Sequence, residues 1–187
     1  MRVQPLIYVS LFATIMGVLG IVPPIFLGFT PVPITLQSFG VMLSGSLLGT
    51  RFSPKYAALS QIVFLLVVAA GLPLLSGGRG GVGVFVSPSG GYLIGYVIGA
   101  YVIGHLFYRM KSLSFLKVLV AYLFGGMIVI YLFGIPFQAF MMDIAIDHAM
   151  VLSIAYLPGD LLKVIVASLL TTKLLKMTPF SRRPASE

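Results

Sequence analysis

An acidic and a basic side chain share one helix face near the end of the chain. The segment reads Leu157-Pro-Gly-Asp-Leu-Leu-Lys163, so Asp160 and Lys163 are three residues apart. Pro158 suits the first turn of a helix, where the helix dipole favours a carboxylate, and residues at i and i+3 are neighbours. The pair offers acceptors and donors to a small polar ligand. The alternative is a structural ion pair, or a lysine that extends its amine toward water.

A glycine-rich loop carries an isolated arginine. In Ser76-Gly-Gly-Arg-Gly-Gly-Val-Gly83, Arg79 lies between Gly78 and Gly80. Glycine lets the backbone approach a ligand closely or turn with positive φ, and the guanidinium can hold an anionic group. No Gly-Lys-Ser/Thr follows, so the loop is not a phosphate-binding P-loop. The alternative is a flexible loop with one solvated arginine.

A segment stiffened by prolines offers two more polar side chains. In Thr30-Pro-Val-Pro-Ile-Thr-Leu-Gln-Ser38, Thr35 and Gln37 can form hydrogen bonds at the entry to a helix. These bonds can serve a ligand, or they can cap the helix.

Small residues at four-residue spacing indicate where helices touch. Gly91, Gly95 and Gly99 form one such set, which favours close packing inside a bundle. Ala13 and Gly17 form a shorter set on an otherwise bulky helix. For this second pair, packing inside the bundle and docking onto another membrane subunit are equally open.

The remaining titratable residues give no catalytic or metal-binding pattern. His105 and His148 are isolated, and Asp143 and Asp147 lie at i and i+4, which is typical of a solvated helix face. The sequence has no HExxH motif, no Ser-His-Asp arrangement and no cysteine. We therefore predict no catalytic residue, no metal site and no cofactor.

The composition requires a membrane around these segments. Of the 187 residues, 59% are hydrophobic and 9% are charged, whereas soluble domains carry about 25% charged residues. A chain this short cannot hide so much apolar surface from water with so few charges. The net charge of +8 does not indicate a nucleic-acid partner, because the basic residues lie between apolar stretches rather than in one patch. We predict an all-α, polytopic integral membrane protein in contact with the lipid bilayer.

Six apolar stretches approach the roughly 20 residues that a membrane crossing needs. We expect one membrane domain over 1–187 with spans at about 6–22, 35–50, 56–71, 91–108, 118–136 and 157–175, and a polar tail at 177–187. No small-residue cleavage site precedes Pro23-Pro24, so the first stretch is expected to be a span rather than a signal peptide. The stretch from Pro136 to Tyr156 is expected to form an interfacial or partly inserted helix.

Basic residues predict the orientation, because Lys and Arg accumulate in short cytoplasmic loops. In a six-span arrangement all but two of the twelve lie on one side: Arg2, Arg51, Lys55, Arg109, Lys111, Lys117, Lys173, Lys176, Arg182 and Arg183. We therefore expect both termini in the cytoplasm. The two exceptions, Arg79 and Lys163, fall in the outer half. The topology thus predicts an outward-facing pocket between the glycine loop and the last span.

Five segments resemble the signature of the BioY family, the biotin-specific S components (substrate-binding membrane subunits) of energy-coupling factor (ECF) transporters. They are Thr30-Pro-Val-Pro-Ile-Thr-Leu-Gln-Ser-Phe-Gly40, Gly71-Leu-Pro73, Gly77-Gly-Arg-Gly-Gly81, Ser87-Pro-Ser-Gly-Gly-Tyr-Leu-Ile-Gly95 and Leu157-Pro-Gly-Asp-Leu-Leu-Lys163. They occur in the family's order and spacing, and the resemblance covers about residues 5 to 176. It implies a six-transmembrane-helix bundle in the plasma membrane that binds biotin from outside and hydrolyses nothing itself.

The resemblance also implies partners and residue roles. The partners would be an ECF transmembrane coupling subunit and two cytosolic ATPase subunits. The family's pocket-lining Asp and Lys map onto Asp160 and Lys163, and its lid maps onto the region around Arg79. The family's docking motif on the first span would be Ala13-x-x-x-Gly17, with glycine in place of the usual second alanine.

The chemistry of biotin matches these residues. Its ureido ring has two N–H donors and a carbonyl, its thioether ring is apolar, and its valerate chain ends in a carboxylate. Our hypothesis is that Asp160 accepts from the ureido nitrogens, Lys163 donates to the ureido oxygen, and Arg79 with the amides of Gly78 and Gly80 meets the carboxylate. The reverse orientation, with Lys163 at the carboxylate, stays open. Further contacts are expected from Thr35, Gln37, Phe39, Tyr92 and Tyr96.

Other functions compete with biotin capture. One is an S component for another vitamin. A self-contained secondary carrier would usually show an inverted repeat with broken helices in both halves, and the sequence shows no such repeat. A structural scaffold would leave Asp160, Lys163 and Arg79 without a role. Retention of biotin and co-purification with ATPase subunits would distinguish these functions.

Overall fold

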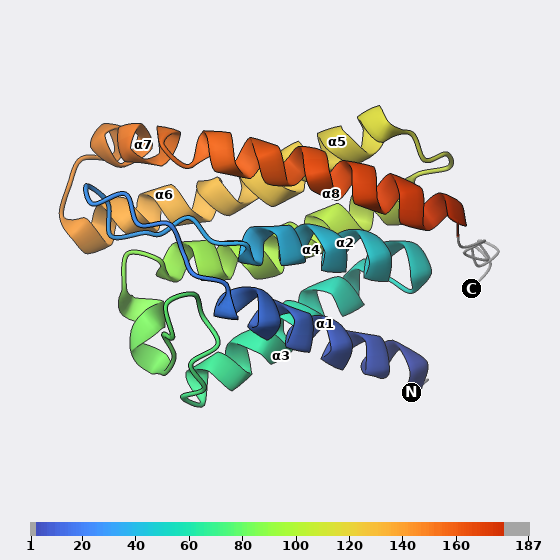
Figure 1. The fold of residues 1–187 in the computed structure, drawn as a ribbon, viewed down its shortest axis with the longest axis horizontal. Coiled ribbons are helices and arrows are strands. Elements are labelled where there is room, and N and C mark those ends of the chain that lie inside the picture. Colours follow the sequence, from blue (N-terminus) through green and yellow to red (C-terminus); the bar gives the residue numbers. More distant parts are fainter. Residues whose placement is uncertain (1–2, 178–187) are drawn as a thin grey trace.

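The computed structural model describes residues 3–177 and forms a bundle of helices (Figure 1). These are α1 (Val3–Ile21), α2 (Gln37–Arg51), α3 (Pro54–Ala69), the 3-10 helix η1 (Val82–Val86), α4 (Gly90–Arg109), α5 (Phe115–Leu123), the π-helical turn η2 (Phe124–Ile128), α6 (Val129–Met142), α7 (Ile146–Ile154) and α8 (Leu157–Met177). Residues 3–177 contain isolated β-bridges but no strand. The predicted all-helical class is confirmed, and the helices match the predicted spans within three residues except at one end of the fifth.

That exception is the helix that contains Pro136. α5, η2 and α6 form one continuous helix of 28 residues, Phe115–Met142. We expected a span at 118–136 and an interfacial or partly inserted helix over Pro136–Tyr156. The boundary at Pro136 was wrong, because Pro136 lies inside α6, and a membrane-type helix tolerates the lost backbone bond. A separate short helix, α7, does lie within that stretch. The helix ends instead at Asp143, which adopts the left-handed conformation (φ 52°) typical of a helix C-terminus.

Several helices have the length and apolar character of membrane spans. Within residues 3–177 these are α1, α4 and the continuous helix Phe115–Met142. α7 and α8, bent by 56° at a short break, form a fourth if they cross as one unit. α2 has 15 residues and α3 has 16, fewer than the roughly 20 of a usual crossing. The count of six spans stays a prediction.

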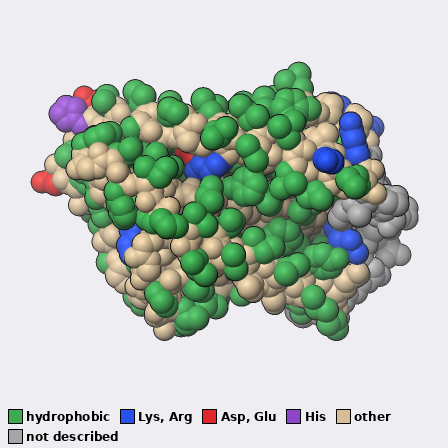
Figure 2. Space-filling model, viewed as in Figure 1, with side chains coloured by type: hydrophobic (Ala, Val, Ile, Leu, Met, Phe, Trp, Pro, Cys, Tyr) green, Lys and Arg blue, Asp and Glu red, His purple; other side chains and the backbone are tan. Residues whose placement is uncertain are grey.

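The two ends of the bundle differ in charge. α1 begins and α8 ends at the same end, at the right of Figure 1. Figure 2 shows most blue side chains at that end, and red and purple ones at the opposite end, where α6 leads into α7. This polarity agrees with the expected orientation, but which end faces the cytoplasm stays a prediction. Outside the described residues lie Arg2, Arg182, Arg183 and all of the predicted polar tail except Met177.

Glycines allow the central helix α4 to approach its neighbours closely. A Cβ atom on Gly49 of α2 would lie 2.4 Å from the Cα atom of Gly104 of α4, and one on Gly95 would lie 2.9 Å from the Cα atom of Ile130 of α6. Cβ atoms on Gly91 and Gly99 would also meet the backbone of the continuous helix. The prediction that this glycine set packs inside the bundle is confirmed.

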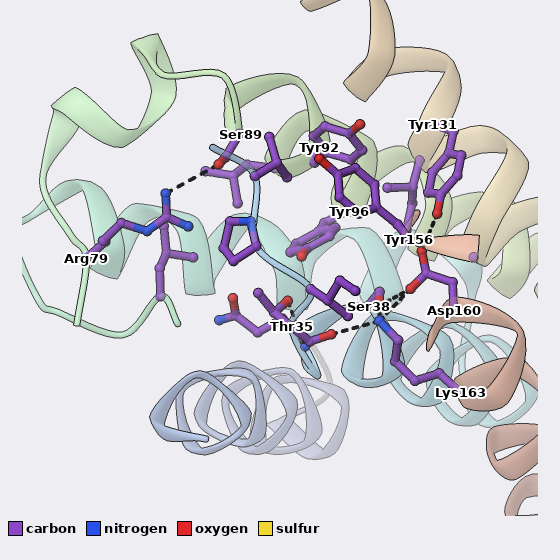
Figure 3. Close-up of a pocket in the computed structure, with 18 residues that line it drawn as sticks. Thr35, Ser38, Arg79, Ser89, Tyr92, Tyr96, Tyr131, Tyr156, Asp160 and Lys163 are labelled. Carbon is purple, nitrogen blue, oxygen red and sulfur yellow. Dashed lines mark hydrogen bonds and ion pairs between the residues drawn. The ribbon is translucent and has the colours of Figure 1, made fainter. Parts of the chain in front are cut away.

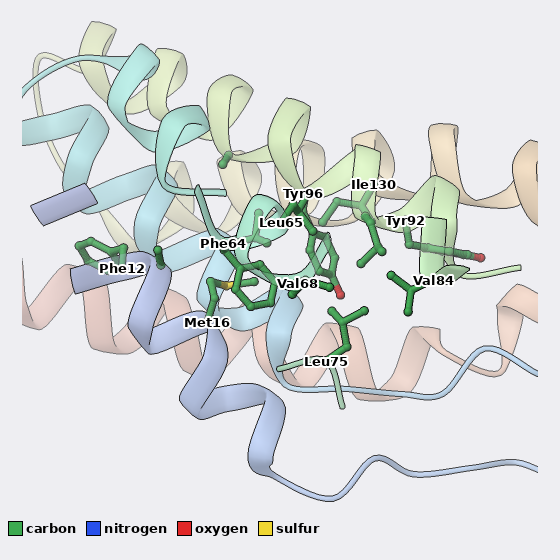
Figure 4. Packing of buried hydrophobic residues seen from close by; sticks show 14 of the residues in the cluster. Phe12, Met16, Phe64, Leu65, Val68, Leu75, Val84, Tyr92, Tyr96 and Ile130 are labelled. Atoms are coloured by element: carbon green, nitrogen blue, oxygen red, sulfur yellow. The ribbon is translucent and has the colours of Figure 1, made fainter. Parts of the chain in front are cut away.

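The larger apolar core lies between α1, α3 and α4. Figure 4 shows it gathered around Tyr96, with Met16 of α1, Phe64 and Val68 of α3, and Leu75 of the following loop. Leu75 and Tyr96 also line the cavity described below. One wall of that cavity is therefore part of the packed core.

Candidate ligand site

A cavity of about 60 Å³ lies where α2, α4 and α8 begin, and its residues come from helices and loops far apart in the chain (Figure 3). The segments before α2 and before α4 contribute to its lining. Its lining comprises Val32, Pro33, Ile34, Thr35, Gln37, Ser38, Leu75, Arg79, Ser89, Tyr92, Leu93, Tyr96, Gly126, Ile130, Tyr131, Tyr156, Asp160 and Lys163.

The predicted acid–base pair forms a buried ion pair in this cavity. Lys163 Nζ lies 2.5 Å from Asp160 Oδ1, and both side chains are about one-tenth exposed. Nζ also donates to the Thr35 carbonyl oxygen and to Ser38 Oγ, each at 2.8 Å. All three donors of the ammonium are thus used, which a buried charge requires. The alternative of a lysine extended toward water is excluded.

Tyr131 is a partner of Asp160 that sequence reasoning missed. Its hydroxyl donates to Asp160 Oδ2 at 2.5 Å, while Ser38 Oγ lies 3.5 Å from Oδ1. A carboxylate has about four acceptor positions, so Asp160 keeps acceptor capacity for a ligand in the cavity. Tyr131 comes from the middle of an apolar helix with no motif around it, and only the fold brings it to α8.

Three tyrosines form an aromatic wall beside the ion pair. The ring of Tyr92 meets the rings of Tyr131 and Tyr156 edge-on, with centroids 6.2 and 6.4 Å apart. The Tyr92 hydroxyl donates to Gln138 Oε1 at 2.8 Å, so it is held away from the ion pair. The predicted wall residues Tyr92 and Tyr96 both line the cavity.

The predicted wall residue Phe39 does not line the cavity. It packs against the second apolar cluster, which includes Met42 and Phe107. Its neighbour Ser38 faces the cavity, and successive helix residues are rotated by about 100° because a turn holds about 3.6 residues. Phe39 therefore points to a different side of α2.

Arg79 reaches the cavity from the glycine loop. Its Nε donates to the Ser76 carbonyl oxygen and its Nη1 to Ser89 Oγ, both at 3.3 Å. Burial lowers the pKa of the guanidinium, and interaction with Tyr96 partly offsets this, but an arginine remains charged at neutral pH. Since both bonded groups are neutral oxygens, the positive charge is available to an anionic ligand group.

Gly78 and Gly80 shape the loop rather than line the cavity. Leu75 and Arg79 exchange backbone hydrogen bonds of 3.0 and 3.2 Å. Gly78 has φ +69°, and a Cβ atom on Gly80 would lie 2.3 Å from the Leu72 carbonyl oxygen. Their role here is the tight turn that directs Arg79 inward, and neither lines the cavity with its amide.

Thr35 and Gln37 line the cavity but are already engaged. Thr35 offers its carbonyl to Lys163. Gln37 Nε2 donates to the carbonyl oxygens of Leu74 at 3.1 Å and Met16 at 3.4 Å, which ties the start of α2 to α1 and to the segment just before the glycine loop. The capping residue of α2 is Leu36, whose side chain makes no capping bond, but the Thr35 hydroxyl accepts from the backbone N–H of Gln37 at 3.4 Å. Both residues therefore position the site's walls.

Ala13 and Gly17 face the interior of this chain. Ala13 is part of the larger core, and a Cβ atom on Gly17 would lie 3.5 Å from the side chain of Leu74. This favours the packing alternative, and docking through this pair stays a prediction. Another small pair with the same spacing, Ser10 and Thr14, lies on the exposed face of α1.

The comparisons with known proteins agree with the fold and the signature. The profile of the BioY family matches residues 1–180. This chain belongs to the BioY family. It is 48% identical over 174 residues to a probable biotin transporter BioY of Bacillus subtilis, covering 93% of this chain and 91% of the relative. It is 43% identical to a biotin transporter BioY of Rhizobium etli, covering 91% and 92%.

A solved structure extends this agreement to three dimensions. The S-component for biotin from an ECF-type ABC transporter superposes with a TM-score of 0.88 at 32% identity, over 96% of this chain and 95% of that one. The BioY resemblance drawn from the five sequence segments is confirmed. Membership in a transporter family, together with several apolar helices, identifies the chain as a membrane protein.

Proposed function

We propose that this chain is the biotin-binding S component of an ECF-type uptake transporter, and that it captures biotin at the outer face of the plasma membrane. The observation that carries the proposal is a cavity with a paired Asp160 and Lys163, an aromatic wall, and an arginine whose partners are neutral. The related proteins named as biotin transporters and as the S-component for biotin support the same ligand. The proposal treats biotin as cargo and assigns the chain no catalytic residue, metal or cofactor.

The charges in the cavity favour one orientation of biotin. Lys163 is already neutralised by Asp160, and a ligand carboxylate at that end would be repelled by the Asp160 carboxylate. The ureido N–H groups suit the remaining acceptor positions of Asp160. Lys163 can donate to the ureido carbonyl if its ammonium releases its bond to Thr35 or to Ser38. The valerate carboxylate then extends toward Arg79.

Entry of biotin requires the cavity to widen. Its volume of about 60 Å³ is well below the roughly 300–1,000 Å³ of typical small-molecule sites. The segment before α2 is held by a hydrogen bond between Thr30 and Tyr156, and the glycine loop by the bond of Arg79 to Ser89. We expect these two segments to move on binding, since they cover the cavity and contain little regular structure.

Equilibrium binding of labelled biotin to the purified protein tests the proposal. We expect saturable binding that unlabelled biotin displaces and that thiamine and riboflavin leave in place. An absence of saturable binding, or displacement by riboflavin as effective as that by biotin, would contradict it.

We further propose that the exposed face of α1 docks onto a transmembrane coupling subunit, which links the chain to cytosolic ATPase subunits. Ser10 and Thr14 are small side chains on this face, and their hydroxyls donate to the carbonyl oxygens of Leu6 and Ser10 in their own helix. Their polar groups are thus satisfied without water, and small residues permit close helix packing in a membrane. The family-derived pair Ala13 and Gly17 would then pack against the interior of this chain and hold α1 in position.

Thr14→Phe should lower co-purification with the ATPase subunits by roughly tenfold or more, equivalent to about 1.4 kcal/mol, because the ring separates the helices. Biotin binding should be unchanged, since Thr14 is on the exposed face of α1. Val166→Phe, on the exposed face of α8, is the matched control and should affect neither property. Full co-purification of the Thr14→Phe protein would place the docking surface elsewhere.

A further inference from the structure

A second hollow opens on the surface between α6 and α7, outside the ligand cavity. Its volume is about 370 Å³, within the range of small-molecule sites. Its lining is mostly apolar and comprises Tyr131, Ile135, Asp147, Met150, Val151, Ser153, Ile154 and Leu157. We call it the α6–α7 groove.

Among residues 3–177, Tyr131 is the one that lines both the groove and the ligand cavity. Its hydroxyl donates to Asp160, and its ring meets Tyr92 edge-on. The groove therefore lies behind a residue that orients the ligand-binding carboxylate. Whatever fills the groove packs on the far side of that ring.

The surroundings of the groove are those of a lipid-facing surface. Met150, Val151 and Ile154 of α7 and Leu132 of α6 are more than half exposed. α7 and α8 together have the length and apolar composition of one membrane span that is interrupted by a bend. Because the chain is a membrane protein, we expect acyl chains to cover the apolar surface around the groove up to its mouth.

The charge at the groove favours one class of headgroup. Asp147 lines the groove from the first turn of α7 and is exposed. Its carboxylate attracts a headgroup ammonium and repels a headgroup that carries only negative charge. A zwitterionic lipid such as phosphatidylethanolamine fits this rim better than phosphatidylglycerol.

We propose that the α6–α7 groove retains an acyl chain of a phospholipid with an ammonium headgroup, and that this chain supports Tyr131 in its contact with Asp160. The retained chain fills the groove while Asp147 binds the headgroup. The lipid thereby becomes part of the wall of the ligand site. Its effect on biotin affinity rests on the proposed function, whereas its binding does not.

Tryptophan fluorescence can test lipid retention, because the chain contains no tryptophan. Val151→Trp places a single fluorophore in the groove, and Leu162→Trp places one on the lipid-facing surface of α8; the native side chains are 64% and 63% exposed. Each variant is reconstituted in phosphatidylglycerol with increasing brominated phosphatidylethanolamine. We expect half-quenching of Val151→Trp at a several-fold lower mole fraction than for Leu162→Trp.

Two further quenching measurements test whether retention in the groove depends on the lipid headgroup. Brominated phosphatidylglycerol should quench both tryptophans alike, and Asp147→Asn should remove the preference of Val151→Trp for phosphatidylethanolamine. Coinciding curves in phosphatidylethanolamine would overturn the proposal, as expected if a partner helix or no molecule fills the groove.

The affinity for biotin tests whether the retained acyl chain supports Tyr131 in its contact with Asp160. We expect the native protein to bind biotin several-fold more tightly in phosphatidylethanolamine than in phosphatidylglycerol, and the Asp147→Asn protein to bind equally in both. Equal affinities of the native protein would overturn the coupling to Tyr131. A failure of the proposed function is recognised separately, because it abolishes biotin binding in both lipids and leaves the quenching unchanged.

Discussion

Asp160→Asn is expected to weaken biotin binding by about 2–4 kcal/mol, which is roughly 30- to 1,000-fold in affinity. The amide removes the charge that neutralises Lys163, whose Nζ is buried 2.5 Å from Oδ1. It also replaces an acceptor with an NH₂ group that faces other donors, including the Tyr131 hydroxyl. Isothermal titration calorimetry of the purified variant with biotin measures the loss.

Asp143→Asn is the matched control for this substitution. Asp143 is exposed in the left-handed conformation at the end of α6, a conformation that asparagine also adopts readily, so biotin affinity should not change. If Asp160→Asn lowers stability too far to measure binding, Tyr131→Phe provides a milder test. It removes one hydrogen bond to Asp160 and should weaken biotin binding by about 1 kcal/mol, which is roughly fivefold in affinity. Native affinity in either site variant would refute the assignment of Asp160.

Arg79→Gln is expected to weaken biotin binding by about 1.5–3 kcal/mol, the usual range for a hydrogen bond to a charged group. The corresponding loss is roughly 10- to 150-fold in affinity. Glutamine retains a donor for Ser89 but has no charge for the valerate carboxylate. The measurement compares biotin with biotin methyl ester, which lacks the carboxylate charge. The ester should bind the native protein and the variant with similar affinity.

The same comparison determines which end of biotin faces which residue. If Lys163 instead met the carboxylate, Arg79→Gln would leave biotin affinity unchanged, and the orientation proposed above would be wrong. Arg109→Gln, at the end of α4 remote from the cavity, serves as the charge-matched control and should bind biotin normally.

Local patterns predicted the helices well, because the length of each apolar stretch and the residues that end it can be read from neighbouring positions in the sequence. The Asp160–Lys163 contact was also predictable, since i and i+3 neighbours follow from helix geometry alone. The helix end predicted at Pro136 was wrong. Proline usually ends a helix in a soluble protein, whereas here the continuous apolar helix includes Pro136 in its interior.

Contacts that depend on the tertiary fold were not predictable in this way. Tyr131 and Ser38 meet Asp160 from helices distant in sequence. Nothing beside Tyr131 distinguishes it from other residues of its helix, and the segment that contains Ser38 does not show which residue it contacts. The pairs Ala13–Gly17 and Ser10–Thr14 have the same spacing, so periodicity could not say which one faces inward. Phe39 was assigned to the ligand by its type, whereas the rotation of α2 turns it toward another cluster.

The internal pairing of Lys163 with Asp160 has an electrical consequence for transport. With these two charges cancelled, the empty cavity carries the single positive charge of Arg79. In the proposed orientation of biotin, its carboxylate brings the sum to zero, so the cargo would act as the counter-ion of its own binding site. A net charge is costly to move through hydrocarbon. A loaded cavity would therefore present no net charge to the bilayer, whereas an empty one would present the positive charge of Arg79.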